Sequence, residues 1–296
     1  MNTVLETATK PTGALNSADA AFGSSRDFIG NRFIYAAISA RARGLSVGVN
    51  LNPDKQCNFN CTYCEVDRLV PGRSGELDLD AMAAELQTLL ALVDAGKLHE
   101  HSPYALLPPE LLRLRHVAIS GDGEPTLCPQ FRAAVEMVVH VRATSPRGFF
   151  KIVLITNASN LDAPEVQNGL QLLTRRDEIW AKLETGTQTH MAQVNKTDVS
   201  LEHILSNILL VARQRPVVIQ SLFPALNGQG PTEGEVGQYV QRLKELKDAG
   251  AQIKLVQIYS ATRPAANSVC GHLPLRTLSQ IAQAVRSGTG LKAEVF

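Results

Sequence analysis

The sequence predicts an α/β protein built on a mainly parallel sheet, and two observations carry this prediction. Short apolar runs typical of strands alternate with longer segments in which apolar residues recur every three or four positions, as in helices. Six such strand–helix units follow one another after residue 44, and a short final strand follows them. Units of this kind form a parallel sheet covered by helices. Six units are compatible with an open doubly wound sheet or with a partial barrel, and the pattern alone does not distinguish between these two architectures.

Each element follows from its own pattern. The first strand, Leu45–Leu51, alternates in polarity, and the helix Asp78–Leu92 places its leucines on one face. The proline-rich stretch 99–114 is expected to be irregular. The other strands are expected at His116–Ser120, Lys151–Thr156, Glu178–Leu183, Val217–Phe223, Ile253–Tyr259 and Leu291–Phe296, and the other helices at Pro129–Ala143, Ala163–Thr174, Leu201–Arg213, Glu233–Lys247 and Leu275–Val285.

Composition narrows the class of protein. Of the 296 residues 44% are apolar and 19% are charged, which is ordinary for a globular protein. The formal net charge of +1 excludes a basic field over the whole surface. No apolar run is long enough for a membrane span, and no secretory signal is evident, so we expect a cytoplasmic protein. We expect residues 1–25 to be a flexible leader and residues 26–296 to form a single domain.

Three of the five cysteines, Cys57, Cys61 and Cys64, follow the first strand with the spacing C-x3-C-x2-C. Such a cluster favours a metal site over disulfides, and three thiolates can hold a cubane iron–sulfur cluster while leaving one iron open. Core cysteines or a structural zinc site are the alternatives, although no Cys or His follows before His99 to complete a zinc site. Cys128 and Cys270 are interpreted as buried apolar thiols.

The cysteine motif, with an aromatic residue before its third cysteine, resembles the signature of the radical S-adenosylmethionine (SAM) superfamily. Three further segments resemble the branch that includes wyosine-type tRNA synthases. They are residues 41–51 (RARGLSVGVNL), residues 120–127 (SGDGEPTL) and residues 256–264 (VQIYSATRP). The resemblance spans residues 32–296 and implies a partial (β/α)6 TIM-like barrel, the radical SAM core, with a short terminal strand.

The resemblance also implies the cofactors. Cys57, Cys61 and Cys64 would bind a [4Fe-4S] cluster, SAM would chelate its open iron, and an electron from the cluster would break a carbon–sulfur bond of SAM. Tyr63 matches a position beside the adenine; the alternative is a core aromatic residue. The residues matching the family's Gly-Gly-Glu-Pro pattern would contact the SAM amino group, although an aspartate stands where its first glycine falls; the alternative is an ordinary turn. Gly123, Glu124 and Pro125 match the pattern, and Gly121 comes directly before it; Gly121, Gly123 and Glu124 are the candidates for cofactor contact.

Further candidates follow the later strands. Asn157 could orient SAM or substrate or simply form a turn. Lys182 and Glu184 lie on the same side of their strand, which points to a polar barrel interior. The resemblance assigns this pair to the SAM carboxylate and ribose, and a structural ion pair is the alternative. Gln257 is placed near the adenine. Arg263 could hold an anionic substrate group or the SAM carboxylate, or form a surface salt bridge.

We therefore expect a radical SAM enzyme whose substrate is a small molecule or peptide, served by a flavodoxin- or ferredoxin-type electron donor, with no membrane partner. The absence of cysteines before Cys57 distinguishes the chain from characterised wyosine-type enzymes. A tRNA-modifying enzyme remains the alternative, and a basic stripe around Arg41, Arg43, Lys55 and Arg68 would favour it. A non-catalytic iron–sulfur carrier or sensor is the second alternative; it would need a fourth ligand, with Cys128 as the candidate.

Overall fold

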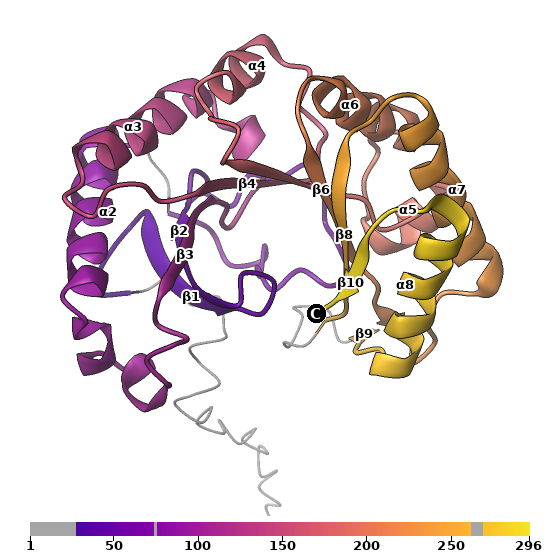
Figure 1. Cartoon of the computed structure of the whole chain (residues 1–296), viewed down its shortest axis with the longest axis horizontal. Helices are drawn as coiled ribbons and strands as arrows, with labels where there is room; N and C mark the ends of the chain where they lie inside the picture. The colour runs from indigo at the N-terminus through magenta and orange to yellow at the C-terminus, as the bar shows by residue number, and fades with distance from the viewer. Residues whose placement is uncertain (1–27, 74–75, 262–268) are drawn as a thin grey trace, which may run out of the picture.

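The computed structural model describes residues 28–73, 76–261 and 269–296. Its main feature is one eight-stranded sheet with the order β1-β2-β3-β4-β5-β6-β8-β10, curled into an open barrel with helices outside (Figure 1). The pairs from β2 to β10 are all parallel, whereas β1 pairs antiparallel with β2. The strands are β1 Ile34–Ser39, β2 Gly44–Val49, β3 Leu114–Ile119, β4 Ile152–Thr156, β5 Glu178–Lys182, β6 Val217–Leu222, β8 Ile253–Tyr259 and β10 Ala293–Val295.

The helices cover the convex side of this sheet. The predicted alternation is confirmed, and each predicted strand and helix is present within a few residues of its expected bounds. The barrel alternative is likewise confirmed over the open doubly wound sheet. The helices are α2 Leu79–Asp94, α3 Phe131–Thr144, α4 Pro164–Leu170, α5 Gln188–Val194, α6 Leu201–Gln214, α7 Glu233–Asp248 and α8 Leu275–Thr289, with 3₁₀ turns η1 Lys97–Glu100, η2 Tyr104–Leu106 and η3 Pro125–Leu127.

Three features of the fold were not predicted. The edge strand β1 continues through a tight hairpin into β2, and the backbone N–H groups of Arg32, Phe33 and Ile34 donate to the Glu85 carboxylate of α2. A two-stranded sheet pairs β7 (Ala225–Leu226) with β9 (Cys270–Gly271). The third is α5, in the connection after β5. The expected leader 1–25 lies outside the described residues, and the stretch 99–114 contains only short 3₁₀ turns before β3.

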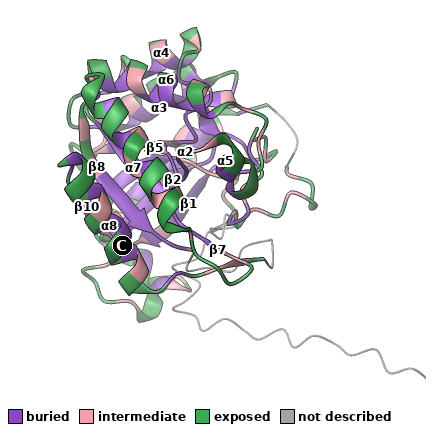
Figure 2. Cartoon of the chain, turned by 90° about the vertical axis from the view of Figure 1, so that its right-hand side faces the viewer, coloured by how far each residue is buried: buried purple, intermediate pink, exposed green. Residues whose placement is uncertain are grey.

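The two faces of the sheet differ in character. Residues such as Val117, Ile179 and Ile219 belong to the main apolar core between sheet and helices. Figure 2 shows exposed residues gathered on the outer surfaces of the helices. Alternate residues on the same strands face the barrel interior, where Val153, Trp180 and Val218 form a separate small cluster. The interior therefore has an apolar layer of its own, below the polar residues considered next.

No helix in the described part of the chain has both the length and the apolar character that crossing a membrane would require. This finding agrees with the absence of long apolar runs in the sequence.

His116 of β3 lies in the interior layer beside the small cluster. It is 3% exposed, its Nε2 lies 2.9 Å from Ser46 Oγ, and its ring meets Trp180 edge-on at 5.3 Å. Burial lowers the pKa of His116 to about 4, and the charges of Lys151 and Arg41 act in the same direction. The folded protein therefore keeps this imidazole neutral at pH values where the unfolded chain protonates it.

We predict that the protein loses stability between pH 6.5 and pH 4 because of His116. Below the ordinary pKa of histidine, His116 is protonated in the unfolded state but stays neutral in the folded state. The free energy of unfolding therefore falls by up to roughly 3 kcal/mol. Urea unfolding at pH 7.5 and pH 5 measures this loss. It should shrink in His116→Gln and persist in the exposed control His99→Gln. An equal loss in wild type and His116→Gln would contradict the assignment.

Candidate functional site

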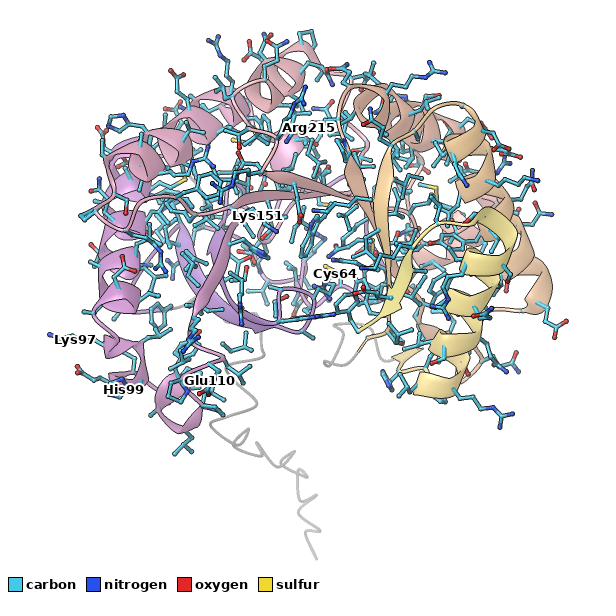
Figure 3. All side chains as sticks on the ribbon, in the orientation of Figure 1. Cys64, Lys97, His99, Glu110, Lys151 and Arg215 are labelled. Atoms are coloured by element: carbon cyan, nitrogen blue, oxygen red, sulfur yellow. The ribbon has the colours of Figure 1, made fainter. Side chains whose placement is uncertain are left out.

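The three cysteines lie on one loop, residues 50–64, which leaves the carboxyl end of β2 and has no regular secondary structure. All three are partly buried, and none of the chain's five cysteines, all in described positions, is in a disulfide. Figure 3 shows Cys64 inside the ring of strands. Because α/β barrels bind ligands at the carboxyl ends of their strands, the loop lies where a functional site is expected. We call residues 50–64 the cysteine loop.

Each cysteine sulfur lies near a different N–H donor. Such donors stabilise thiolates in iron–sulfur centres and influence their reduction potential. The pairs are Phe59 N to Cys57 Sγ at 3.5 Å, Asn195 Nδ2 to Cys61 Sγ at 3.5 Å, and Arg68 Nη2 to Cys64 Sγ at 3.8 Å.

Burial keeps two of the thiols neutral in the metal-free protein. It raises the pKa of Cys57, and it raises the pKa of Cys61 to about 11 even though Lys182 acts in the opposite direction. Cysteine ligands must be deprotonated, so metal binding at this loop would release protons.

The arrangement suits a cluster better than a single ion. Among the described residues, no three His, Cys, Asp or Glu side chains are placed to hold one metal ion. A structural zinc site needs four ligands that converge on one point, so the zinc alternative is disfavoured. In a cubane each thiolate binds a different iron, so the three sulfurs converge on one cluster and need not share a single metal ion. Three thiols with separate N–H donors therefore fit a cluster with three protein ligands.

The other two cysteines lie elsewhere. Cys128 follows η3 and packs in the main core with 7% exposure, as expected for a buried thiol. Cys270 is only partly buried, because β9 lies at the edge of the fold, so the expectation of a buried thiol is wrong for it. It packs against an apolar cluster that contains Tyr63 and Tyr259, which Cys61 also borders.

The turn after β3 packs directly against the cysteine loop. A Cβ at Gly121 would lie 2.1 Å from Asn50 Oδ1, and one at Gly123 would lie 2.0 Å from the carbonyl oxygen of Gln56. The same carbonyl accepts a hydrogen bond from Glu124 N at 2.9 Å. The two glycines of the resemblance motif are thus required for close backbone approach. Their contacts in this structure are with the loop that carries the cysteines.

Glu124 is 3% exposed, and its carboxylate is engaged within the protein. Its Oε1 accepts from Thr126 Oγ1 at 2.7 Å, Thr126 N at 3.2 Å and Thr156 Oγ1 at 2.6 Å, and its Oε2 accepts from Asn157 N at 2.7 Å. Burial raises the pKa of Glu124, while these hydrogen bonds oppose the rise. Glu124 therefore ties the turn after β3 to the end of β4, and its role toward SAM stays a prediction.

Asn157 contacts the cysteine loop directly. Its Nδ2 donates to Asn58 Oδ1 at 2.9 Å, and its Oδ1 accepts from Ser159 N at 2.9 Å. Asn58 in turn donates to Ser159 Oγ at 2.9 Å. The side chain predicted to orient SAM or form a turn thus holds the first residue after Cys57.

Tyr63 and Glu184 form one connected group with Asn195. Tyr63 Oη donates to Glu184 Oε1 at 2.6 Å, and Asn195 Nδ2 donates to Glu184 Oε2 at 3.0 Å as well as approaching Cys61. The loop backbone also pairs with this segment, since Thr62 N donates to Val194 O at 2.9 Å. Glu184 therefore reaches the cysteine loop from the end of β5, on the interior side that its strand position predicts.

Lys182 is partly buried and places a positive charge near the cysteines. Its Nζ lies 5.2 Å from the centre of the Tyr63 ring. Burial alone would lower the pKa of Lys182, but Tyr259, Glu184 and the nearby thiols raise it above its usual range. A small cavity between β5 and the loop is lined by Lys182 and Glu184 together with Phe59 and Asn195. The predicted interior orientation of Lys182 and Glu184 is confirmed by these contacts.

Gln257 and Arg263 complete the predicted set. Gln257 is 2% exposed and accepts from Gln220 Nε2 at 3.2 Å across the β6–β8 pair, so both amides face the interior. Its place near an adenine stays a prediction. Arg263 lies outside the described residues.

Each of the four cations named for the RNA-binding alternative has a contact within the chain. Lys55 Nζ donates to the carbonyls of Asp67 and Val70, and Arg68 donates to the carbonyl of Lys55. Arg41 stacks on Tyr259, with its guanidinium carbon 4.2 Å from the ring centre. Arg43, whose side chain is 74% exposed, forms an ion pair with Glu294.

Several side chains that build the site were not predicted. Apart from Arg68, their partners lie far away in the sequence, so no local spacing marks them. A signal existed for Asn58, which stands inside the cysteine motif, and for Arg68, which stands four residues after Cys64. These residues are Asn58, Arg68, Ser159, Asn195 and Gln220.

Comparison with known proteins gives distant relatives. No family model matches the chain. A UPF0026 protein of Helicobacter pylori strain J99 is 27% identical over 139 residues, which are 47% of this chain and 39% of that protein. A UPF0026 protein of Synechocystis is 25% identical over 178 residues, 59% of this chain and 57% of that protein. The chain thus spans roughly half the length of the curated relatives it matches.

The solved structures with a similar fold include enzymes of the expected kind. SuiB of Streptococcus suis, bound to S-adenosylmethionine, matches with a TM-score of 0.58 at 13% identity, covering 86% of this chain and 52% of that one. A radical SAM methyltransferase of Sphaerobacter thermophilus gives 0.58 at 12%, covering 89% and 68%. TYW1 with a bound lysine–pyruvate adduct gives 0.54 at 14%, covering 93% and 82%. The chain therefore has the partial-barrel fold of radical SAM proteins, and the resemblance inferred from its motifs is confirmed at that level.

We predict that Gly123→Ala abolishes iron binding. The added methyl group would collide with the Gln56 carbonyl and push the cysteine loop out of place. Iron content after anaerobic reconstitution should fall from about four per chain to below about one. Gly237→Ala is the matched control, because a Cβ at this α7 position meets nothing within 4 Å. Normal iron content in Gly123→Ala would show that the loop does not depend on this contact.

We predict that Glu124→Ala destabilises the whole protein. The substitution leaves the buried donors of Thr126, Thr156 and Asn157 without an acceptor. Each unsatisfied buried donor lowers the free energy of unfolding by about 1–3 kcal/mol, without strict additivity. Urea denaturation should show a midpoint well below wild type, whereas the exposed control Glu136→Ala should match wild type. An unchanged midpoint in Glu124→Ala would show that these hydrogen bonds do not stabilise the fold.

Proposed function

We propose that the chain is a radical SAM enzyme that binds one [4Fe-4S] cluster through Cys57, Cys61 and Cys64. The observation that carries this proposal is the cysteine loop itself, in which three thiols at the carboxyl edge of the barrel each face an N–H donor. When bound, the cluster would supply the electron that cleaves SAM reductively, and the protein contributes position and shielding.

The chain's own residues would hold SAM on the interior side of the loop. Lys182 provides an ammonium group suited to the SAM carboxylate. Glu184, Tyr63 and Gln257 offer polar groups that reach the interior from β5, the loop and β8, consistent with the ribose and adenine roles that the resemblance implies. Gly121 and Gly123 keep the adjacent backbone close enough to the loop to present carbonyl groups there.

The substrate we propose is a small molecule or a peptide. The contacts of the cations that would favour tRNA support this choice: Arg41 stacks on Tyr259, Lys55 and Arg68 donate to backbone carbonyls, and Arg43 pairs with Glu294. A flavodoxin- or ferredoxin-type protein is the proposed electron donor. A closed iron–sulfur carrier is less well supported, because Cys128 packs in the main core.

The test is anaerobic incubation of the reconstituted protein with SAM and dithionite, followed by mass analysis of the SAM fragments. We expect about four irons per chain and cleaved SAM. Cys57→Ala, Cys61→Ala and Cys64→Ala should each abolish cleavage, while Cys128→Ala and Cys270→Ala should retain it. The masses of the fragments identify which sulfonium bond breaks.

A protein that holds four irons and leaves SAM intact would instead be an electron carrier or sensor. Loss of the cluster in Cys128→Ala would point the same way, because it would reveal a fourth protein ligand.

A further inference from the structure

Arg41 is a partly buried cation, and one nitrogen of its guanidinium, the buried Nε, is unused. It belongs to the β1–β2 hairpin and reaches the Tyr259 ring at the end of β8, with 4.2 Å between guanidinium carbon and ring centre. Among the described residues, its buried Nε has no hydrogen-bond partner. A buried donor without a hydrogen-bond partner reduces the stability of the folded protein, so a role for this group in binding a ligand is worth considering.

The neighbouring charges do not neutralise Arg41. Glu184 accepts from Tyr63 and Asn195 and lies beside Lys182. Glu294 pairs with Arg43 and Lys292. Arg41 also interacts electrostatically with His116 and lowers the pKa of that imidazole. Because burial keeps His116 neutral, His116 provides no negative charge to Arg41.

Two cations thus share one interior region. Lys182 lies next to the cysteines, and the Tyr259 hydroxyl interacts with it electrostatically. The Arg41 guanidinium lies over the ring of the same residue. Tyr259 is therefore shared by Lys182, which comes from β5, and by Arg41, which comes from the β1–β2 hairpin. A guanidinium is weakly hydrated and binds oxyanions through a planar set of donors, so it suits an anion site inside a barrel.

We propose that Arg41 is the anchor of a substrate subsite that binds an oxyanion, a carboxylate or phosphate group, inside the barrel. The proposal rests on the proposed function, in which Lys182 serves SAM and leaves Arg41 for the second substrate. It makes the substrate an anionic small molecule or peptide, held so that its anionic group lies on the Tyr259 side of the interior.

The test is direct anion binding to the full-length protein. Sodium acetate and sodium phosphate are titrated separately at constant ionic strength, and the fluorescence of Trp180, the chain's single tryptophan, reports on the barrel interior. We expect saturable binding in wild type and at least about tenfold weaker binding in Arg41→Gln, the loss typical of one charge-assisted contact. The matched control is Arg43→Gln, two residues along the same hairpin but exposed, which should bind like wild type.

Tighter binding of acetate would assign a carboxylate-bearing substrate, and tighter binding of phosphate a phosphate ester. SAM affinity of the cluster-loaded protein should be equal in wild type and Arg41→Gln. If Arg41→Gln does not fold, Arg41→Lys carries the test, because an ammonium group lacks the planar set of donors and should weaken binding.

Three results would overturn the proposal. They are no anion binding by wild type, equal binding by wild type and the Arg41 variants, and a loss of SAM affinity in Arg41→Gln, which would assign Arg41 to SAM itself. Anion binding is measured without SAM cleavage. A failure of this subsite and a failure of the proposed enzyme activity are therefore separate outcomes.

Discussion

The cysteine loop has to be held by other parts of the chain, and this constraint organises the whole carboxyl edge of the barrel. A segment without regular secondary structure cannot satisfy its own backbone groups. Here the turn after β3, the end of β4 and the segment after α5 each supply contacts to a different part of the loop. The three thiols keep their positions because three separate segments of the chain fix the backbone of the cysteine loop.

Polar residues inside the barrel follow from the same constraint. A strand that packs against helices on one side and borders a ligand space on the other alternates between core residues and residues that face the interior. On β5 the residues on the interior side are the apolar Trp180 and the charged Lys182. The apolar layer around Trp180 closes the interior below, and the charged groups gather above it near the cysteines. Charges in such a place interact strongly because little water screens them.

Much of the fold was predictable from local pattern. The parallel strands are apolar runs, and α2 and α6 bury a regular stripe of apolar residues, so their periodicity is visible in the sequence. Strand β1 was missed because its place depends on pairing with β2 and on the Glu85 carboxylate, neither of which a local pattern marks. The cysteines were predictable from spacing, whereas Asn195 becomes visible only when the chain folds, since it stands 134 residues from Cys61.

The structure also changes how the resemblance motifs are understood. Glu124, Asn157, Glu184 and Tyr63 stood as candidates for SAM or substrate contacts on the sequence alone, yet each makes hydrogen bonds that support the cysteine loop or the elements behind it. A residue that positions the cluster ligands and also borders the cofactor space couples the two sites. In the proposed enzyme, placing the thiols would therefore arrange the groups proposed to face SAM at the same time, because one set of side chains does both. Metal binding to such a loop would be linked to the folding of the loop.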